Sequence, residues 1–113
     1  MSQTIAEVDD SNFKQIVLEA KRPVLVDFWA PWCEPCRTLG PIVESVAQQY
    51  ATTAQVVKLN VDANPSIALR YSVQAIPTLI LFRNGKEKDR LIGTRSKEAI
   101  ARAIDAHIGS ALN

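Results

Sequence analysis

Two cysteines three positions apart, Cys33 and Cys36, are the residues of this chain best suited to do chemistry. Side chains at this spacing on one helix face have Cβ atoms about 5–6 Å apart. A disulfide requires Cα atoms roughly 4.4–6.8 Å apart. The two sulfurs can therefore bond and separate with little movement of the backbone, which is what a redox pair requires.

Other uses of the same cysteine pair must be weighed against redox chemistry. A cross-link that closes a loop of about 4 residues contributes only roughly 2 kcal/mol in the chain-entropy model, so a structural staple would gain more from distant cysteines. Structural zinc takes four ligands, usually Cys and His, and the chain offers only one distant histidine, His107. The spacing favours thiol–disulfide chemistry, while an inert pair and a metal site, including one shared between chains, stay open.

Length and composition place limits on the fold and on the function classes. The 113 residues are 47% hydrophobic, which predicts a single domain over residues 1–113 with its own core. The net charge of +1 gives no reason to expect nucleic acid or a membrane surface as partner. The N-terminus lacks the pattern of a secretory signal, and no apolar run approaches the length of a membrane-spanning helix. We therefore expect a cytoplasmic protein, in which a lone cysteine pair is more plausibly catalytic than structural.

The hydrophobic pattern predicts helices alternating with strands, then a hairpin. Asp10 and Ser11 offer an N-cap for a first helix that carries Phe13 and Val17 on one face. A near-continuous apolar run over 24–29 is typical of a strand covered on both faces. Further strands are expected over 56–61, 78–82 and 87–92, and further helices over 36–50, 66–71 and from 96 to about Gly109. This order indicates an α/β fold whose sheet has an antiparallel edge.

The cysteines fall between a buried strand and the start of a long helix. A helix N-terminus carries roughly half a positive charge and unpaired N–H groups, both of which favour a thiolate. Cys33, nearer this terminus, should ionise first. We expect Cys36, one turn further in, to be more covered and to remain a thiol.

With these elements in place, the chain closely resembles the thioredoxin family along nearly its whole length. The matching motifs are Val26-Asp27-Phe28-Trp29-Ala30, Trp32-Cys33 with Pro35-Cys36-Arg37, Pro41, Lys58, Val61-Asp62, Asn64-Pro65, Ile76-Pro77-Thr78, Phe82, Asn84-Gly85 and Gly93. The resemblance implies a central five-stranded mixed sheet flanked by four α-helices. It also implies a protein-disulfide reductase that carries electrons in cell redox homeostasis and binds no cofactor.

Residue roles follow from the same resemblance. Cys33 matches the attacking cysteine, which forms a mixed disulfide with a client protein, and Cys36 matches the resolving cysteine. Asp27 matches a buried carboxylate that takes the proton from the resolving thiol. Since a carboxylate inside an apolar strand is costly unless paired or protonated, burial should raise the Asp27 pKa. Lys58 matches a lysine near that carboxylate, although a solvent-exposed strand position is nearly as good an explanation.

The resemblance also implies a client-binding surface. The bond before Pro77 is cis in the family and faces the cysteines, whereas sequence alone gives only about 5–6% odds of cis. An apolar groove with an edge for strand addition is expected, formed by Trp32, Val61, Ile76, Pro77, Ile92 and Gly93. Ordinary core packing is the alternative for the two isoleucines. Trp29, within the strand end, is expected in the core.

Glu34 is the chief departure, because most thioredoxins have glycine at this position. With Pro35, it lies between the cysteines, and both should tune the redox pair together with Lys58. A carboxylate in the first helical turn suits the helix dipole but repels a neighbouring thiolate. We expect Glu34 to raise the Cys33 pKa and to make the pair more reducing than in a Glu34→Gly variant, by roughly 10–50 mV.

Two function classes fit these features. The first is a thiol–disulfide oxidoreductase that reduces client proteins and is itself reduced by a thioredoxin reductase, NADPH- or ferredoxin-linked. The second is a thioredoxin-fold binding or chaperone subunit whose cysteines are incidental. The joint presence of Cys33, Cys36, Asp27 and Pro77 favours the first. A monomer without bound metal is expected.

Overall fold

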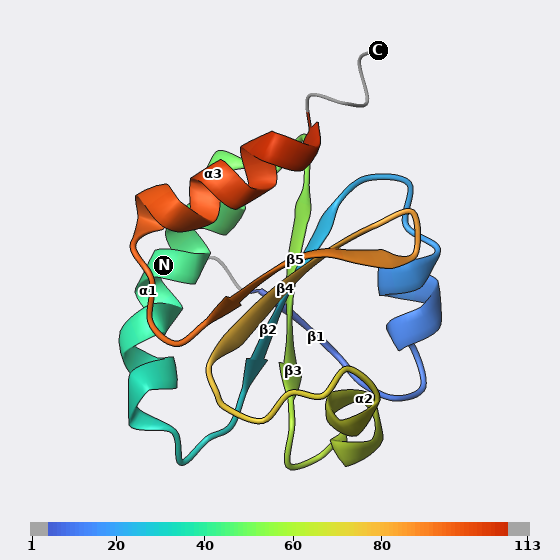
Figure 1. Cartoon of the computed structure of the whole chain (residues 1–113), viewed down its shortest axis with the longest axis vertical. Coiled ribbons are helices and arrows are strands. Elements are labelled where there is room, and N and C mark those ends of the chain that lie inside the picture. The colour runs from blue at the N-terminus through green and yellow to red at the C-terminus, as the bar shows by residue number, and fades with distance from the viewer. Residues whose placement is uncertain (1–4, 109–113) are drawn as a thin grey trace.

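The computed structural model describes residues 5–108, which form a five-stranded sheet between two layers of helices (Figure 1). Along the chain the elements are β1 (Ala6–Val8), η1 (Lys14–Leu18), β2 (Val24–Trp29), α1 (Glu34–Gln49), β3 (Gln55–Asn60), α2 (Pro65–Arg70), β4 (Thr78–Arg83), β5 (Lys86–Ile92) and α3 (Lys97–Ile108). The expected α/β architecture, with a five-stranded mixed sheet and four helices, is confirmed.

The sheet has the strand order β1-β3-β2-β4-β5. β1 and β2 both run parallel to β3, whereas β4 is antiparallel to β2 and to β5. The central position of β2 explains its apolar sequence, because helices cover both faces and leave no polar side. Asn84 and Gly85 join β4 to β5 with positive φ angles of 56° and 78°, as a two-residue hairpin turn requires.

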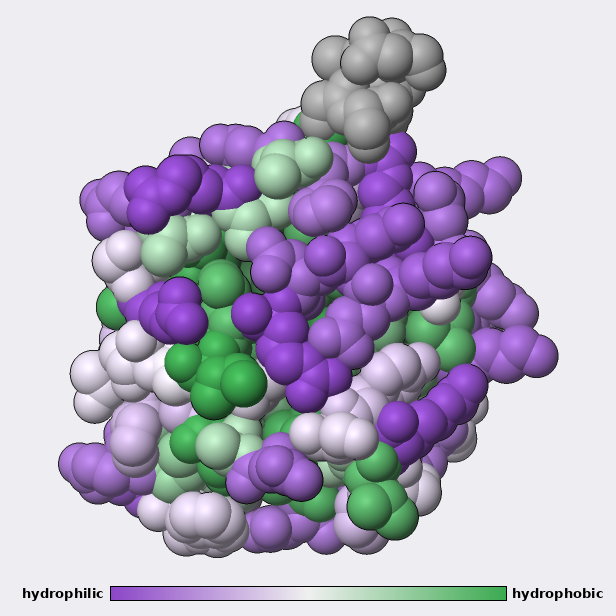
Figure 2. Space-filling view, in the orientation of Figure 1, coloured by the Kyte–Doolittle hydropathy of each residue, from purple (hydrophilic) through white to green (hydrophobic). Residues whose placement is uncertain are grey.

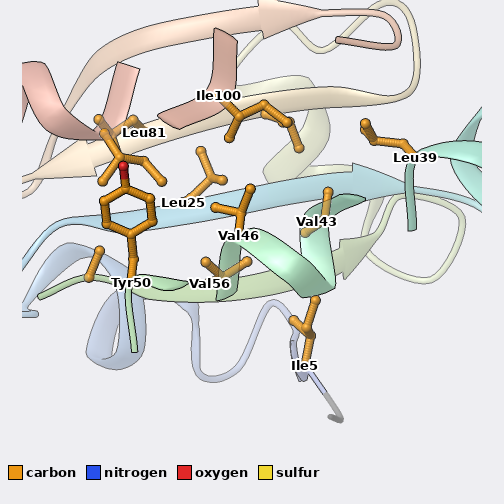
Figure 3. Close-up of a cluster of buried hydrophobic side chains, with 12 residues drawn as sticks. Ile5, Leu25, Leu39, Val43, Val46, Tyr50, Val56, Leu81 and Ile100 are labelled. Atoms are coloured by element: carbon orange, nitrogen blue, oxygen red, sulfur yellow. The ribbon is translucent and has the colours of Figure 1, made fainter. Parts of the chain in front are cut away.

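Two hydrophobic clusters fill the space between the sheet and its helical layers. α1 and α3 cover one face, and η1 and α2 cover the other (Figure 1). On the first face, Leu39, Val43 and Val46 of α1 pack with Ile100 and Ile104 of α3 over the sheet (Figure 3). On the second face, the cluster is built around Val8, Phe13, Val17, Val26, Phe28, Val57, Leu59, Ile67, Ile80 and Phe82. The helical stripe expected from Cys36 to Tyr50 is buried as predicted.

The first helix differs from the expectation. It is a short π-helical turn, and Asp9, not Asp10 or Ser11, supports its entry: the Asp9 carboxylate accepts hydrogen bonds from the Ser11 and Asn12 amides at 2.9 and 3.1 Å. Asp9 and Asp10 carry the same carboxylate, and either could accept a hydrogen bond from an unpaired amide at the start of a helix. Residue type alone therefore does not distinguish Asp9 from its neighbours as the cap. Phe13 and Val17 are buried as expected.

The sequence pattern predicted the last helix correctly, but it did not predict the first strand. The Ser96 hydroxyl accepts a hydrogen bond from the Ala99 amide at 3.1 Å, which confirms the predicted cap of α3. The expected end near Gly109 lies outside the described residues. β1 has only three residues and was not identified from its own sequence. That omission matters, because β1 carries Glu7.

The packing of α1 should determine the stability of the cysteine site, because the same helix carries both. Leu39 is fully buried one turn beyond Cys36. Leu39→Ala should lower the free energy of unfolding by about 2–5 kcal/mol, since it removes transfer energy and leaves a cavity. Thr38→Ala, on the exposed side of the same turn, should stay within about 0.5 kcal/mol of the parent. Urea titration of both variants checks this; equal losses would contradict the packing.

Candidate active site

The two cysteines are joined in a disulfide at the point where α1 begins, with their Cα atoms 5.2 Å apart. Cys33 is the N-cap of α1, and its Sγ accepts a hydrogen bond from the Cys36 amide at 3.2 Å. A sulfur in this position accepts a hydrogen bond from an amide and lies at the positive end of the helix dipole. In the reduced protein these interactions favour a thiolate at Cys33.

The expected order of burial of the two cysteines is wrong for this disulfide. Cys33 is 2% exposed and Cys36 is 8% exposed, so Cys36 is not the more covered residue. The reason lies in a cavity of about 340 Å³, which Cys36 lines together with Asp27, Trp29, Arg37, Gly40 and Lys58. Cys36 thus borders the same cavity as the Asp27 carboxyl.

Asp27 is the buried acid predicted from the apolar strand. Its residue is 6% exposed, and its Oδ1 atom has no hydrogen-bond partner among the described residues. Burial raises the pKa of Asp27 from 3.8 to about 7, against the opposing attraction of Lys58 and with a further rise caused by Glu7. The carboxyl can therefore take up and release a proton near neutral pH, and it lines the same cavity as Cys36.

Lys58 lies beside Asp27 in the sheet but does not pair with it. Asp27 and Lys58 are register partners on β2 and β3. The Lys58 Nζ lies 3.7 Å from Oε2 of Glu7, on β1, and 4.8 Å from the centre of the Trp29 ring. Lys58 is thus partly covered and close to the carboxylate, as the resemblance implied, while its ion pair is with an acid that the sequence did not single out.

Trp29 is half-buried and not fully inside the core as expected. The indole N–H of Trp29 is buried and has no partner at normal hydrogen-bond geometry within the described residues. It still lies close enough to the Glu7 carboxylate to lower the Glu7 pKa. Desolvation has the larger, opposite effect, so the Glu7 pKa is raised overall. Trp29 therefore forms a wall of the cavity between the cysteines and the Glu7–Lys58 pair.

Glu34, the departure from the family pattern, is not an isolated charge. Its Oε1 lies 2.9 Å from Nη1 of Arg37, one helical turn on, and both side chains are largely exposed. Arg37 also donates a hydrogen bond to the Pro31 carbonyl at 3.0 Å. Arg37 thus places a positive charge beside the negative charge of Glu34, which reduces the net field of the pair at the cysteines.

Of the residues expected to bind clients, Val61 and Ile76 pack against the Cys33–Cys36 cluster. The bond between Ile76 and Pro77 is cis, as expected. Trp32 is 66% exposed and Ile92 is 54% exposed, so neither is ordinary core. Gly93 has a φ of 86° and donates its amide to the Pro77 carbonyl at 2.8 Å.

The polarity of the surface differs from one part of the face in Figure 2 to another. In Figure 2, hydrophilic side chains cover most of β5, and apolar surface gathers beyond the end of β5, towards the start of α1. Trp32, which directly precedes Cys33, is held by a hydrogen bond from its Nε1 to Oδ2 of Asp62, at 2.8 Å. An exposed aromatic side chain fixed in this way next to the disulfide is suited to contact another protein.

Sequence reasoning missed three contributors to the site: Glu7, Asp62 and the pairing role of Arg37. Asp62 and Arg37 stand in motifs that were recognised, so their positions were known but their partners were not. Glu7 could be found only from strand register, and β1 was too short to predict. Within residues 5–108 there is no group of three or more His, Cys, Asp or Glu arranged to hold a metal ion. No helix in this range is long and apolar enough to cross a membrane.

The raised pKa of Asp27 predicts a specific pH dependence of stability. Between about pH 4 and pH 7 the folded protein retains a proton that the unfolded chain has released, so the free energy of unfolding falls as the pH rises through this range. In an Asp27→Asn variant this contribution is absent. Relative to the variant, the parent should lose about 2–4 kcal/mol across this range. Urea titrations of both oxidised proteins at the two pH values measure it; parallel pH profiles would show that Asp27 titrates normally.

Comparison with known proteins agrees with this geometry. The family model described as thioredoxin matches residues 4–106. Thioredoxin 1 of Synechococcus elongatus is 50% identical over 103 residues, which are 91% of this chain and 96% of the relative. Thioredoxin 1 of a Nostoc species is 47% identical over 103 residues, with the same two coverages. Thioredoxins act through their own cysteine pair without a cofactor. The chain therefore belongs to the thioredoxin family and is a thiol–disulfide oxidoreductase with protein-disulfide reductase activity.

Proposed function

We propose that Cys33 is the nucleophile and Cys36 the resolving thiol in the reduction of disulfides in client proteins. The Cys33 thiolate bonds to one client sulfur, and the other client sulfur leaves as a thiolate. Cys36, once deprotonated, then attacks the Cys33 sulfur, forms the Cys33–Cys36 disulfide and releases the second client thiolate. The client gains two electrons and the cysteine pair is oxidised. The observation that carries this assignment is the hydrogen bond from the Cys36 amide to the Cys33 sulfur at the start of α1.

Asp27 is the acceptor of the Cys36 proton in this proposal. The carboxyl and Cys36 line the same cavity, and a pKa of about 7 allows the carboxyl to bind the proton and lose it again at neutral pH. Among the described residues that line the cavity, no other carboxyl is buried: Glu44, the second acid, is half-exposed. Burial therefore distinguishes Asp27 as the acid–base group.

The client binds along the surface formed by Trp32, Val61, Ile76, Pro77, Ile92 and Gly93. The main chain of Ile76 makes no hydrogen bond within the described part of the chain, which leaves it able to pair with an extended client segment. Trp32 and Ile92 are exposed and supply apolar contact. Recognition through main-chain pairing would accept clients of many sequences.

The remaining parts of the proposal concern the chain as a whole. One domain over residues 1–113 acts as a monomer in the cytoplasm, and a thioredoxin reductase returns electrons to its disulfide. The family model, which spans residues 4–106, supports the single domain. The near-neutral net charge of +1 supports protein clients over nucleic acid.

Trapping separates the roles of the two cysteines and of Asp27. Cys36→Ser should accumulate a mixed disulfide between Cys33 and a client such as insulin, because the resolving thiol is gone. Cys33→Ser should accumulate none. Asp27→Asn should slow release of reduced client at pH 7 by roughly 10-fold or more, as expected when a general base is lost. Stopped-flow single turnovers with mass spectrometry measure each step. Undiminished release by Asp27→Asn would remove it from the mechanism and leave the cysteine roles intact.

The Glu34–Arg37 pair predicts opposite shifts in reduction potential. Glu34→Gln removes a negative charge near the Cys33 thiolate, so the reduced form is stabilised and the potential rises. Arg37→Gln removes the positive charge and lowers it. Each shift should be roughly 10–50 mV, and the double variant should return close to the parent. Equilibration with glutathione measures all four proteins. Shifts in the same direction, or none, would show that these charges do not reach the cysteines.

A further inference from the structure

A row of three ionisable side chains crosses the sheet beneath the active site. Glu7 on β1 is the register partner of Lys58 on β3, and Lys58 is the register partner of Asp27 on β2. Register partners on neighbouring strands project to the same face of a sheet. Lys58 therefore stands between two acids and can pair with either of them.

The lysine is held on the side of Glu7. Its Nζ lies 3.7 Å from Oε2 of Glu7, and it also lies over the Trp29 ring at 4.8 Å. Among residues 5–108, no ion pair within 4 Å joins Lys58 to Asp27, and Oδ1 of Asp27 has no hydrogen-bond partner. The cation is thus drawn away from a buried carboxyl that has a free acceptor atom.

We propose that Glu7 is a positioning residue for disulfide reduction: by holding the Lys58 ammonium on the β1 side of the sheet, it keeps Asp27 free to take the Cys36 proton. This inference rests on the proposed role of Asp27. Glu7 itself touches neither the cysteines nor the client surface, and it acts through Lys58. A fully paired Asp27 would stay ionised and would be a weaker proton acceptor.

The other charged groups near Asp27 do not replace Glu7 as the partner of the Lys58 ammonium. From α1, Arg37 and Glu44 line the same cavity, but Arg37 is already paired with Glu34. Cys33 and Cys36 are joined in a disulfide and do not titrate in the oxidised protein. On β4, the register partner of Asp27 is Leu79, which has no charge. Lys58 is therefore the cation whose position decides whether Asp27 is paired, and Glu7 is its partner.

Loss of Glu7 should change the titration of Asp27 more than it changes the stability of the folded protein. The side chains of Glu7 and Lys58 are both partly open to solvent, and an ion pair of this kind contributes about 0–1 kcal/mol to stability. Asp27 is buried, so water and salt screen its interaction with a nearby cation much less. Loss of Glu7 should therefore alter the titration of Asp27 in a protein that remains folded.

The test follows the ¹³C chemical shift of the Asp27 carboxyl against pH in the oxidised full-length chain, with Asp27→Asn to assign the signal. In Glu7→Gln, the titration midpoint should move to lower pH, and the protonated fraction at pH 7 should fall at least about two-fold. At a pH above both midpoints, where Asp27 is ionised in both proteins, client release should be slower in Glu7→Gln, because the more acidic carboxyl is the weaker proton acceptor. Glu98→Gln, which removes an exposed acid from α3, should leave the titration unchanged and serves as the charge control.

A second background separates positioning from the charge of Glu7 alone. In Lys58→Met there is no ammonium to hold, so adding Glu7→Gln should change the titration much less than it does in the parent. An unchanged midpoint in Glu7→Gln, or an equal change in both backgrounds, would overturn the proposal. Because the carboxyl is read without a client, this result is independent of whether Asp27→Asn slows release.

Discussion

The structure depends most on one local arrangement: the loop from β2 ends at the residue that caps α1, and that residue is Cys33. Its sulfur accepts the Cys36 amide at 3.2 Å, in the place where a Ser or Asp oxygen commonly caps a helix. The interaction that begins the helix is therefore also the one that stabilises a thiolate. The buried stripe of α1 and the central position of β2 keep this junction fixed.

The sheet supplies the second chemical group of the site, the Asp27 carboxyl. Asp27 lies within an apolar strand, so the fold tolerates a buried carboxyl whose pKa is raised to about 7 by that burial. Asp27 and Cys36 line the same cavity. In the proposed mechanism, helix geometry activates the nucleophile, while the resolving thiol depends on a carboxyl that the sheet supplies.

Much of this arrangement could be predicted from the sequence, and the failures have physical causes. The apolar run of β2, the Asn84-Gly85 turn and the Ser96 cap are local signals that tertiary packing did not override. β1 is three residues long, too short for a period to show, so Glu7 and its pairing with Lys58 could not be foreseen. Burial of the cysteines was misjudged because a cavity between elements has no signature in a linear pattern.

The reactivity of the two thiols in the reduced protein tests the central arrangement most directly. Brief alkylation with iodoacetamide over a range of pH, followed by peptide mass spectrometry, gives the rate at each cysteine. Cys33 should be modified first, and its rate should reach half of the maximum well below pH 8.5, the value typical of a free thiol. Preferential modification of Cys36, or a Cys33 rate at neutral pH no greater than that of a free thiol, would contradict it.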